Sequence, residues 1–394
     1  MLLAPATEEA VAAMVRVARG ANMPLAIEGG GTRRGLGRPS QAAQTISLKN
    51  LSGITLYEPS EMVIGAWAGT PLAVIQDTLD ARGQMLPFEP MDHRLLLGTT
   101  GEPSIGAVAA CNISGPRRIT AGACRDSLIG VRFVNGRGEI IKNGGRVMKN
   151  VTGLDLVKLQ AGAHGTLGIL TEVIFKVLPK PAIQATLAFH GLSDSTGIAM
   201  LCSAMTSPFE PSGVAHLPAG IGGPKPRTLI RIEGFPEQII YRTAELSKRL
   251  ASADQPELIE GKVQDALWRD IRDAAFLAEP RDQAVWRLSL VPSKAAAGVA
   301  AIQSKRPIRH FYDWSGGLVW IATVEAGDAG AALMQATAAN LGGHATLVRT
   351  SDATRAAVGV FQPLDAVIET LQAGLKASFD PDGILNPGRM VAGV

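Results

Sequence analysis

Apolar and polar positions recur along the chain with two periods, one typical of helices and one typical of strands. A helical period runs from Thr7, a residue type that caps helices, to Gly20. The same period returns after Thr70 and Pro71 and stops at Gly83. The pattern therefore predicts two amphipathic helices, each with one apolar face.

Short apolar segments around these helices predict strands. The sequence Asn135-Gly136 separates two of them and is typical of a hairpin turn. The strands expected before residue 179 cover residues 24–27, 45–48, 54–57, 62–66, 129–134, 139–142 and 170–178.

The segment Pro179-Lys180-Pro181 marks the expected domain boundary. Beyond it strands alternate with clear helical patterns, which predicts an antiparallel sheet with helices on one face. The expected strands lie near residues 184–190, 228–233, 285–290, 308–312 and 317–322, and the expected helices near 237–250, 262–275, 293–303 and 329–341.

A last helix is expected from Leu364 to Phe379, with apolar residues at helical spacing on one side. Two stiff turns follow, Asp380-Pro381-Asp382-Gly383 and then residues 384–389. Free chain ends normally fray, so these turns predict a tail that is packed against the rest of the protein.

Glycine is the recurring residue of two stretches, residues 28–37 and 99–172. Backbone N–H groups freed from side-chain bulk form a concave nest for an anion, and Thr99, Thr100 and Ser104 add hydroxyl groups. A phosphate-bearing cofactor fits this pattern. The alternative is a set of tight turns in a purely structural α/β protein.

Two common phosphate signatures do not match the first stretch. Arg34 stands where the dinucleotide pattern requires its last glycine, and Leu36 replaces the lysine of a P-loop. A Rossmann or P-loop site is therefore excluded.

Composition narrows the class of protein further. The 394 residues carry a formal net charge of only +3 without basic runs, which gives no support to nucleic-acid binding. Cys111, Cys124 and Cys202 lack the spacing of a zinc or iron–sulfur site. With no apparent export signal or long apolar segment, we expect a cytoplasmic protein.

Five motifs resemble the FAD-binding proteins of the vanillyl-alcohol oxidase and p-cresol methylhydroxylase superfamily. They lie at residues 28–32, from Ser104 to Gly115, and at 149–156, 162–172 and 379–389. Within that superfamily the chain is most similar to the FAD-binding E subunits of bacterial glycolate oxidase. The resemblance implies an α+β fold: a two-part FAD-binding domain over residues 1–180, an α+β cap domain with an antiparallel sheet over 181–363, and a C-terminal helix and tail over 364–394 that return to the first domain.

The resemblance also assigns cofactor-binding residues. It implies a first pyrophosphate loop at Gly29–Thr32, a second loop from Ser104 to Gly115, an adenine contact near Ile169, and flavin contacts at Pro90 and Asn386. The full set is Gly29, Gly30, Gly31, Thr32, Arg33, Pro90, Thr100, Gly101, Ser104, Ile105, Gly106, Asn112, Gly115, Ile169 and Asn386.

Two departures from the family pattern bear on the cofactor. Ala107 stands where many members have a glycine, and its methyl group either crowds the cofactor or is harmless. No histidine lies between Glu28 and Gly37, where some members attach FAD covalently. Non-covalent FAD is therefore expected.

Oxidising a 2-hydroxy acid requires a base, a cation for the carboxylate and a flavin beside the substrate carbon. Relatives with this activity carry a His-Gly-x-Gly motif with further histidines, which this sequence lacks. His344 and Arg349 are the candidates, with a structural histidine as the alternative. Arg117 and Arg118 either hold a carboxylate or lie on a solvated surface. Other residues weighed are most simply structural: His164, His190, His216, His310, Trp286, Trp314 and Trp320.

Three functions remain open. The first is an FAD-dependent oxidoreductase subunit that converts glycolate to glyoxylate beside a paralogous flavoprotein D subunit and an iron–sulfur F subunit. The second is a paralogue that only scaffolds this complex, and the third is a stand-alone 2-hydroxy acid dehydrogenase. Because the cysteines cannot form an iron–sulfur relay, electrons would leave through another protein or a diffusible acceptor. Through such partners the chain could also attach peripherally to the inner face of the cell membrane.

Overall fold

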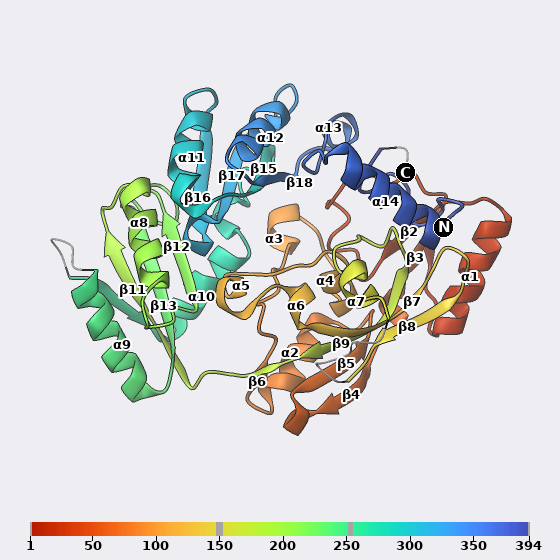
Figure 1. Cartoon of the computed structure of the whole chain (residues 1–394), viewed down its shortest axis with the longest axis horizontal. Helices are drawn as coiled ribbons and strands as arrows, with labels where there is room; N and C mark the ends of the chain where they lie inside the picture. Colours follow the sequence, from red (N-terminus) through yellow and green to blue (C-terminus); the bar gives the residue numbers. More distant parts are fainter. Residues whose placement is uncertain (1, 147–152, 251–254, 393–394) are drawn as a thin grey trace. The chain divides into compact units, whose positions relative to one another are not determined.

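The computed structural model describes residues 2–146, 153–250 and 255–392, and the chain forms two compact units (Figure 1). The first unit comprises Met1–Ser114, Gly122–Lys180 and Leu364–Val394, and the second comprises Gly115–Ala121 and Pro181–Pro363. The segment Gly115–Ala121 thus departs from the expected boundaries, because it groups with the second unit. Residues 149–152 of the third motif lie outside the described residues.

The N-terminal helix α1 (Glu8–Gly20) begins where the sequence predicted. The Thr7 hydroxyl accepts a hydrogen bond from the Ala10 backbone N–H at 3.1 Å, and Glu9 lies in the first turn, where the helix dipole favours a negative charge. Next to it lies a parallel sheet in the order β1-β3-β2, formed by β1 (Leu2–Leu3), β3 (Gln44–Ser47) and β2 (Leu25–Glu28).

A five-stranded antiparallel sheet forms the rest of the first unit's framework. Its hairpin turn is longer than two residues, because the Asn135 N–H donates to the Glu139 carbonyl and Gly138 takes the left-handed conformation at φ +72°. The strand order is β4 (Ile54–Glu58), β5 (Val63–Trp67), β9 (Ile169–Lys176), β7 (Leu128–Val134) and β8 (Ile140–Gly144).

Short helices connect these strands and complete the apolar core of the first unit. The predicted helix after Pro71 is confirmed as α2, and Leu72, Ile75 and Leu79 are its buried residues. The connecting elements are α2 (Leu72–Asp80), α3 (Arg94–Leu97), α4 (Ile105–Ala110), α6 (Cys124–Ser127), α7 (Leu156–Gln160) and the strand pair β6 (Gln84–Met85) and β10 (Leu178–Pro179).

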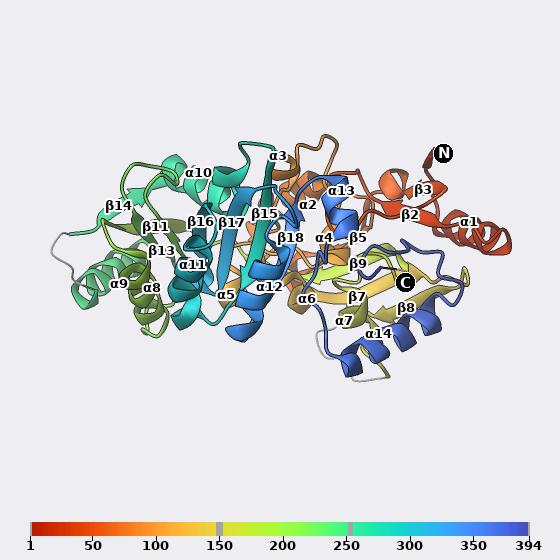
Figure 2. The ribbon, with the colours of Figure 1, turned by 90° about the horizontal axis from the view of Figure 1, so that it is seen from above.

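The C-terminal helix α14 (Ala366–Phe379) forms as predicted, but its expected apolar side is not buried. Ile368, Leu371 and Leu375 remain 40%, 59% and 37% exposed, and Lys376 is the buried residue of the helix. Figure 2 shows α14 along the edge of the first unit. The tail beyond it is packed, because the Leu25 N–H donates to the Ile384 carbonyl at 2.8 Å.

The second unit contains one eight-stranded antiparallel sheet. Each neighbouring pair of strands runs antiparallel. The order is β14 (Glu257–Glu260), β11 (Ile183–His190), β13 (Arg227–Gly234), β12 (Gly213–Leu217), β16 (Ile308–Asp313), β17 (Leu318–Val324), β15 (Gln283–Ser289) and β18 (His344–Arg349).

Helices cover both faces of this sheet, not one face as expected from the sequence (Figure 2). Ala185 and Leu187 pack in the core with helix-borne side chains on one face, while Thr186 between them points to the other face. There the Trp268 indole N–H of α10 donates to the Thr186 hydroxyl at 2.8 Å. The helices are α8 (Asp194–Met205), α9 (Pro236–Arg249), α11 (Ala295–Gln303) and α12 (Ala331–Asn340) on the first face, and α10 (Gly261–Arg272) on the second.

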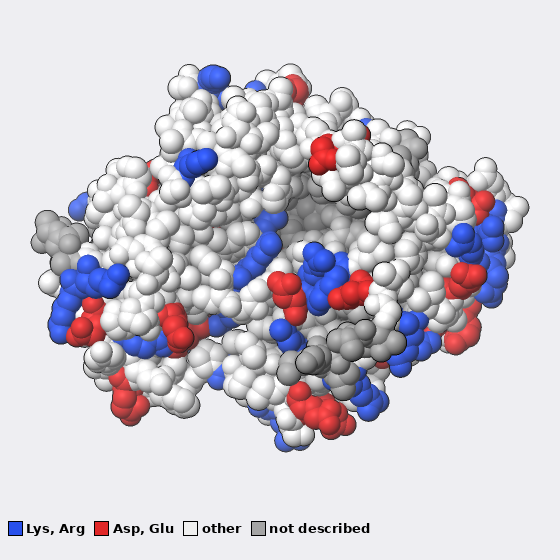
Figure 3. Space-filling model, in the orientation of Figure 1, with Lys and Arg blue, Asp and Glu red and all other residues white. Residues whose placement is uncertain are grey.

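Charged residues of both signs are interspersed on the face drawn in Figure 3, and much of that face is uncharged. This distribution agrees with the small net charge of +3.

Candidate functional site

The first glycine loop of the candidate site follows strand β2. The loop consists of the residues directly after the strand, Gly29, Gly30, Gly31 and Thr32. Gly31 has a φ of +78°, a conformation that favours glycine. In the described part of the chain, the backbone N–H groups of Gly30, Gly31 and Thr32 have no hydrogen-bond acceptor. The loop therefore offers free donors to a ligand.

The second loop begins earlier than the predicted Ser104, because the segment Thr100–Ser104 that leads into α4 lies directly against the first loop. The Thr99 hydroxyl donates to the Thr32 carbonyl at 2.9 Å. A Cβ atom on Gly30 would lie 2.0 Å from the Glu102 carbonyl oxygen, and one on Gly101 would lie 2.4 Å from the Gly30 carbonyl oxygen. These glycines are required because the two loops approach each other, whether or not a ligand is bound.

Arg33 contributes a buried cation with unused hydrogen-bonding capacity. The residue is 8% exposed, and one guanidinium nitrogen donates to the Met91 carbonyl at 3.0 Å. Its Nε and Nη1 atoms have no partner among the described residues. Burial lowers the pKa of Arg33, while the charges of Cys111 and Asp92 oppose that shift.

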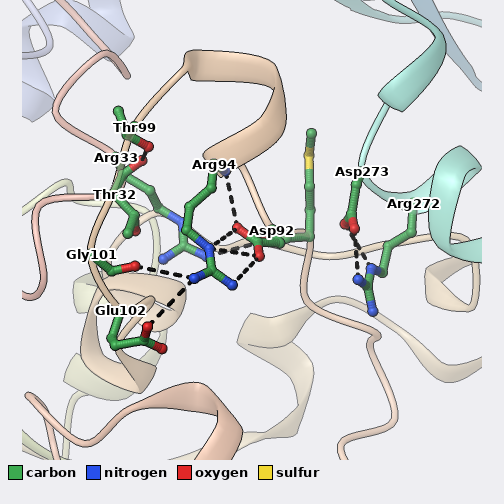
Figure 4. Close-up of polar contacts among 10 residues, drawn as sticks. Thr32, Arg33, Asp92, Arg94, Thr99, Gly101, Glu102, Arg272 and Asp273 are labelled. Atoms are coloured by element: carbon green, nitrogen blue, oxygen red, sulfur yellow. Dashed lines mark hydrogen bonds and ion pairs between the residues drawn. The ribbon is translucent and has the colours of Figure 1, made fainter. Parts of the chain in front are cut away.

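Asp92 and Arg94 lie beside Arg33 (Figure 4). Arg94 donates to the Asp92 carboxylate at 2.8 Å and to the Gly101 carbonyl at 3.2 Å, so it links the acid to the second loop. Burial opposes ionisation of Asp92, but hydrogen bonds from Arg94 and the charge of Arg33 hold its pKa below its usual range.

These residues fit the diphosphate of a dinucleotide cofactor. The Ser104 hydroxyl is buried without a partner within the described structure, as are the two Arg33 nitrogens, and the loops present free N–H groups. Buried donors without acceptors destabilise a protein unless a ligand satisfies them, and backbone N–H nests with a guanidinium are suited to phosphate.

The other predicted cofactor residues lie in the first unit, except Gly115. Asn386 is buried and bridges two segments, because it accepts from the Ile27 N–H at 2.9 Å and donates to the His164 carbonyl at 2.8 Å. Ile169 is fully buried in the core, so its backbone is the part left for a ligand. The Gly115 carbonyl accepts from the Trp314 indole N–H at 3.1 Å within the second unit.

Three further positions have local structural roles. Asn112 takes a φ of +48°, and its side-chain oxygen accepts from the Arg125 N–H at 2.9 Å. Pro90 is buried next to Met91, whose carbonyl receives the Arg33 bond. Gly106 packs so closely on strand β5's end that a Cβ atom there would lie 2.4 Å from the Ala68 Cβ atom. These contacts fix the backbone around the loops.

The two catalytic candidates of the second unit differ in their surroundings. Arg349 is 7% exposed, and its guanidinium donates to the carbonyls of Ala278 and Pro280, at 2.6 and 3.0 Å. This arrangement serves the local backbone. His344 is exposed at the start of β18, and burial of its ring together with the charges of Arg287 and Arg118 lowers its pKa.

A polar cluster that the sequence did not indicate joins two histidines, His216 and His310. Asp194 accepts from the Nε2 atoms of His216 and His310, at 3.3 and 2.8 Å, and from the Tyr312 hydroxyl at 2.8 Å. Burial opposes ionisation of Asp194, but these hydrogen bonds hold its pKa well below its usual range. The residues come from α8, β12 and β16, so no sequence spacing reveals them.

Comparisons with known proteins identify the family of this chain. A family model described as an FAD binding domain matches residues 1–144. The chain is 34% identical over 370 residues to glycolate oxidase subunit GlcE of Escherichia coli (strain K12), covering 94% of the chain and 93% of that relative. The chain belongs to the GlcE family. FAD is accordingly its cofactor, and it is a flavoprotein of the oxidoreductase class within the vanillyl-alcohol oxidase and p-cresol methylhydroxylase superfamily.

Two more distant similarities agree with this assignment. Glycolate oxidase subunit GlcD of Bacillus subtilis (strain 168) is 27% identical over 187 residues, or 47% of this chain and 38% of that relative. The structure of 4-ethylphenol oxidase from Gulosibacter chungangensis superposes with a TM-score of 0.71 at 14% identity, covering 99% of this chain and 89% of the other. The second similarity concerns the fold alone.

Among the described residues, no helix is long and apolar enough to cross a membrane.

Proposed function

We propose that this chain binds FAD non-covalently in its first unit and takes part in oxidising glycolate, or a related 2-hydroxy acid, to the 2-oxo acid. The observation that carries the proposal is the pair of facing glycine loops with free N–H donors beside the unpaired Arg33 nitrogens. Gly30, Gly31 and Thr32 would hold one phosphate, with Ser104 and Arg33 completing the diphosphate site.

The reaction removes two electrons and two protons from the hydroxy acid, and FAD supplies the two-electron acceptor. The chain's own residues must bind the carboxylate, orient the C2–H bond and accept the hydroxyl proton. His344 is the candidate base, because its lowered pKa keeps the imidazole neutral near pH 7.

We place the chain in a complex with a paralogous flavoprotein subunit and an iron–sulfur subunit. The supporting observations are the relatives called subunits and the isolated positions of Cys111, Cys124 and Cys202, which are free thiols. Within the described ranges no group of three His, Cys, Asp or Glu side chains is arranged to hold a metal ion. Electrons would therefore leave through a partner, and membrane attachment would be peripheral.

A scaffold function without catalysis is the second candidate. Arg349, one of the two residues considered for catalysis, is engaged with backbone carbonyls instead of facing an open site. In this case the chain would retain FAD as a structural element, and the paralogous subunit would carry out the reaction. A flavin that stays oxidised in the presence of glycolate would indicate a role that depends on partner subunits, and a colourless protein would favour the scaffold.

The decisive experiment is the visible spectrum of the protein purified alone, before and after anaerobic addition of glycolate. Flavin absorbance that bleaches with glycolate would establish both FAD binding and substrate oxidation. A colourless protein that rejects added FAD would refute the proposal.

A glycine variant tests the location of the cofactor. Gly30→Ala introduces a Cβ atom 2.0 Å from the Glu102 carbonyl oxygen and must push the two loops apart. We expect FAD affinity to fall at least about tenfold, equivalent to about 1.4 kcal/mol. The matched control is Gly20→Ala at the end of α1, where a Cβ atom meets nothing within 4 Å. Equal flavin content in the two variants would contradict the assignment of the loops.

A further inference from the structure

Two arginines of the second unit converge on one tryptophan ring. The guanidinium carbon of Arg118, in α5 (Arg118–Ala121), lies 4.7 Å from the centroid of the Trp314 ring, and that of Arg287, in β15, lies 5.1 Å from it. Each cation is attracted by the ring, but the charge of Arg118 disfavours the charged form of Arg287. An anion bound to Arg287 near Arg118 would offset that repulsion.

The backbone around Trp314 is held in a strained conformation. Trp314 and Ser315 have φ values of +53° and +57°, in the left-handed region that bulky side chains rarely occupy. Two hydrogen bonds fix the residue, from its N–H to the Asp313 carboxylate at 2.7 Å and from its indole N–H to the Gly115 carbonyl at 3.1 Å. Such strain persists where the surrounding structure requires one orientation, and it is common at ligand sites.

Arg287 is a cation with unused hydrogen-bonding capacity. It has its contact with Trp314 but no hydrogen bond or ion pair with another described residue. Burial, followed by the charge of Arg118, lowers the pKa of Arg287 to about 10, and the charge of Asp313 opposes this shift. The Arg287 guanidinium therefore keeps its donors for a ligand.

The position of Arg287 in the sheet shows which other groups lie near it. Trp286 and Leu288 on either side pack in the core with α11 and α12, so the Arg287 side chain points to the opposite face. Arg287 pairs with Thr346 across β18, and Ser289 pairs with His344. His344 therefore lies on the same face as Arg287, two residues along β18 from Thr346.

We propose that Arg118 and Arg287 bind the carboxylate of a small 2-hydroxy acid over the Trp314 ring. This inference rests on the proposed oxidation of such an acid. A planar guanidinium pairs with a carboxylate through two parallel hydrogen bonds, and it also stacks on an aromatic face. A bound carboxylate would pair with the Arg287 guanidinium and bring the substrate hydroxyl to the face that carries His344. Arg118 is one of the two adjacent arginines for which the sequence left a carboxylate role open.

The test measures ligand binding to the FAD-loaded protein without turnover. Oxalate is the probe because it carries carboxylates but has no C–H bond to oxidise, and neutral oxamide is the control ligand. Binding is measured by isothermal titration calorimetry for the wild type and for Arg118→Gln, Arg287→Gln and Arg281→Gln. Arg281 is an exposed arginine paired with Glu279 in the same unit and serves as the matched control.

We expect oxalate to bind the wild type and Arg281→Gln equally, and oxamide to bind neither. Each of the other two variants should weaken oxalate binding by roughly 10- to 100-fold, as expected for a lost charged hydrogen bond. If a glutamine variant does not fold, Arg118→Lys and Arg287→Lys retain the charge but lose the planar fork, and a loss of at least about threefold is expected. Unchanged oxalate affinity in both arginine variants would overturn the proposal.

Two further outcomes separate this proposal from the proposed function. If the wild type holds FAD but does not bind oxalate, the substrate site is overturned and the cofactor assignment stays intact. The same conclusion holds if these arginines instead pair with an acidic segment of another protein. Oxalate binding that depends on both arginines in a protein that rejects FAD would support the carboxylate site and refute the flavin-dependent function.

Discussion

Replacing Lys376 by methionine should destabilise the first unit more than any exposed ion pair does. The Lys376 ammonium donates to the Thr166 carbonyl at 2.9 Å, the Leu385 carbonyl at 3.0 Å and the Asp380 carboxylate at 2.6 Å. The side chains of Lys376 and Asp380 are only 9% and 0% exposed. Methionine keeps most of the aliphatic stem but removes all three hydrogen bonds.

The expected cost follows from what the substitution leaves behind. Removing one partner of a buried ion pair costs about 3–5 kcal/mol, because the remaining charge is isolated from water. The Asp380 carboxylate still accepts from the Ile384 and Leu385 N–H groups, at 3.2 and 2.8 Å, which places the cost near the lower end, about 3 kcal/mol. For a domain of roughly 150–250 residues this corresponds to a fall of about 6–12 °C in Tm.

The assay is thermal unfolding of the FAD-free protein followed by circular dichroism, with Lys180→Met as the control. Lys180 pairs with Asp80 at 2.8 Å in the same unit, but the two side chains are 55% and 53% exposed. A surface pair of this kind contributes about 0–1 kcal/mol. A Tm shift for Lys376→Met no larger than that of the control would refute the reasoning.

Two other substitutions test the buried polar contacts. Asp194→Asn should cost about 2–3 kcal/mol at pH 7 through weakened charged hydrogen bonds. Because the folded-state pKa of Asp194 is lowered, its stabilisation is complete above about pH 5 and decreases progressively as the pH falls below about 4. The difference in urea unfolding between wild type and variant should therefore shrink in acid, unlike that of the surface control Asp382→Asn. Asn386→Leu should lower the free energy of unfolding by about 2–4 kcal/mol, because it leaves a backbone N–H and a carbonyl unpaired in the interior. The control Asn50→Ala removes an exposed hydrogen bond and should cost less than about 1 kcal/mol in the same denaturation assay. A constant Asp194 difference at all pH values, or equal effects of the two asparagine substitutions, would contradict these assignments.

The sequence alone determined most of the secondary structure, and its glycine loops predicted a phosphate-bearing cofactor. Helix α1 begins at its predicted capping residue Thr7, and α2 begins directly after Pro71 as predicted but ends at Asp80, before Gly83. Capping residues and apolar spacing are local signals in the chain. The glycine loops were also visible, since glycine at such density indicates close approach of the backbone to something else. Only the fold shows that the two loops approach each other, at Gly30 and Gly101.

Only the tertiary structure decided which side of α14 is buried and which charged groups meet. The helical period of α14 was correct, but a buried Lys376 is possible only because Asp380 and two carbonyls from other segments surround its ammonium. Asp194 likewise joins histidines from two strands that lie far apart in the chain. No sequence pattern singled out Arg287. Its side chain acquires a role because strand pairing and the strained Trp314 bring it to Arg118, and such long-range contacts leave no local pattern in a sequence.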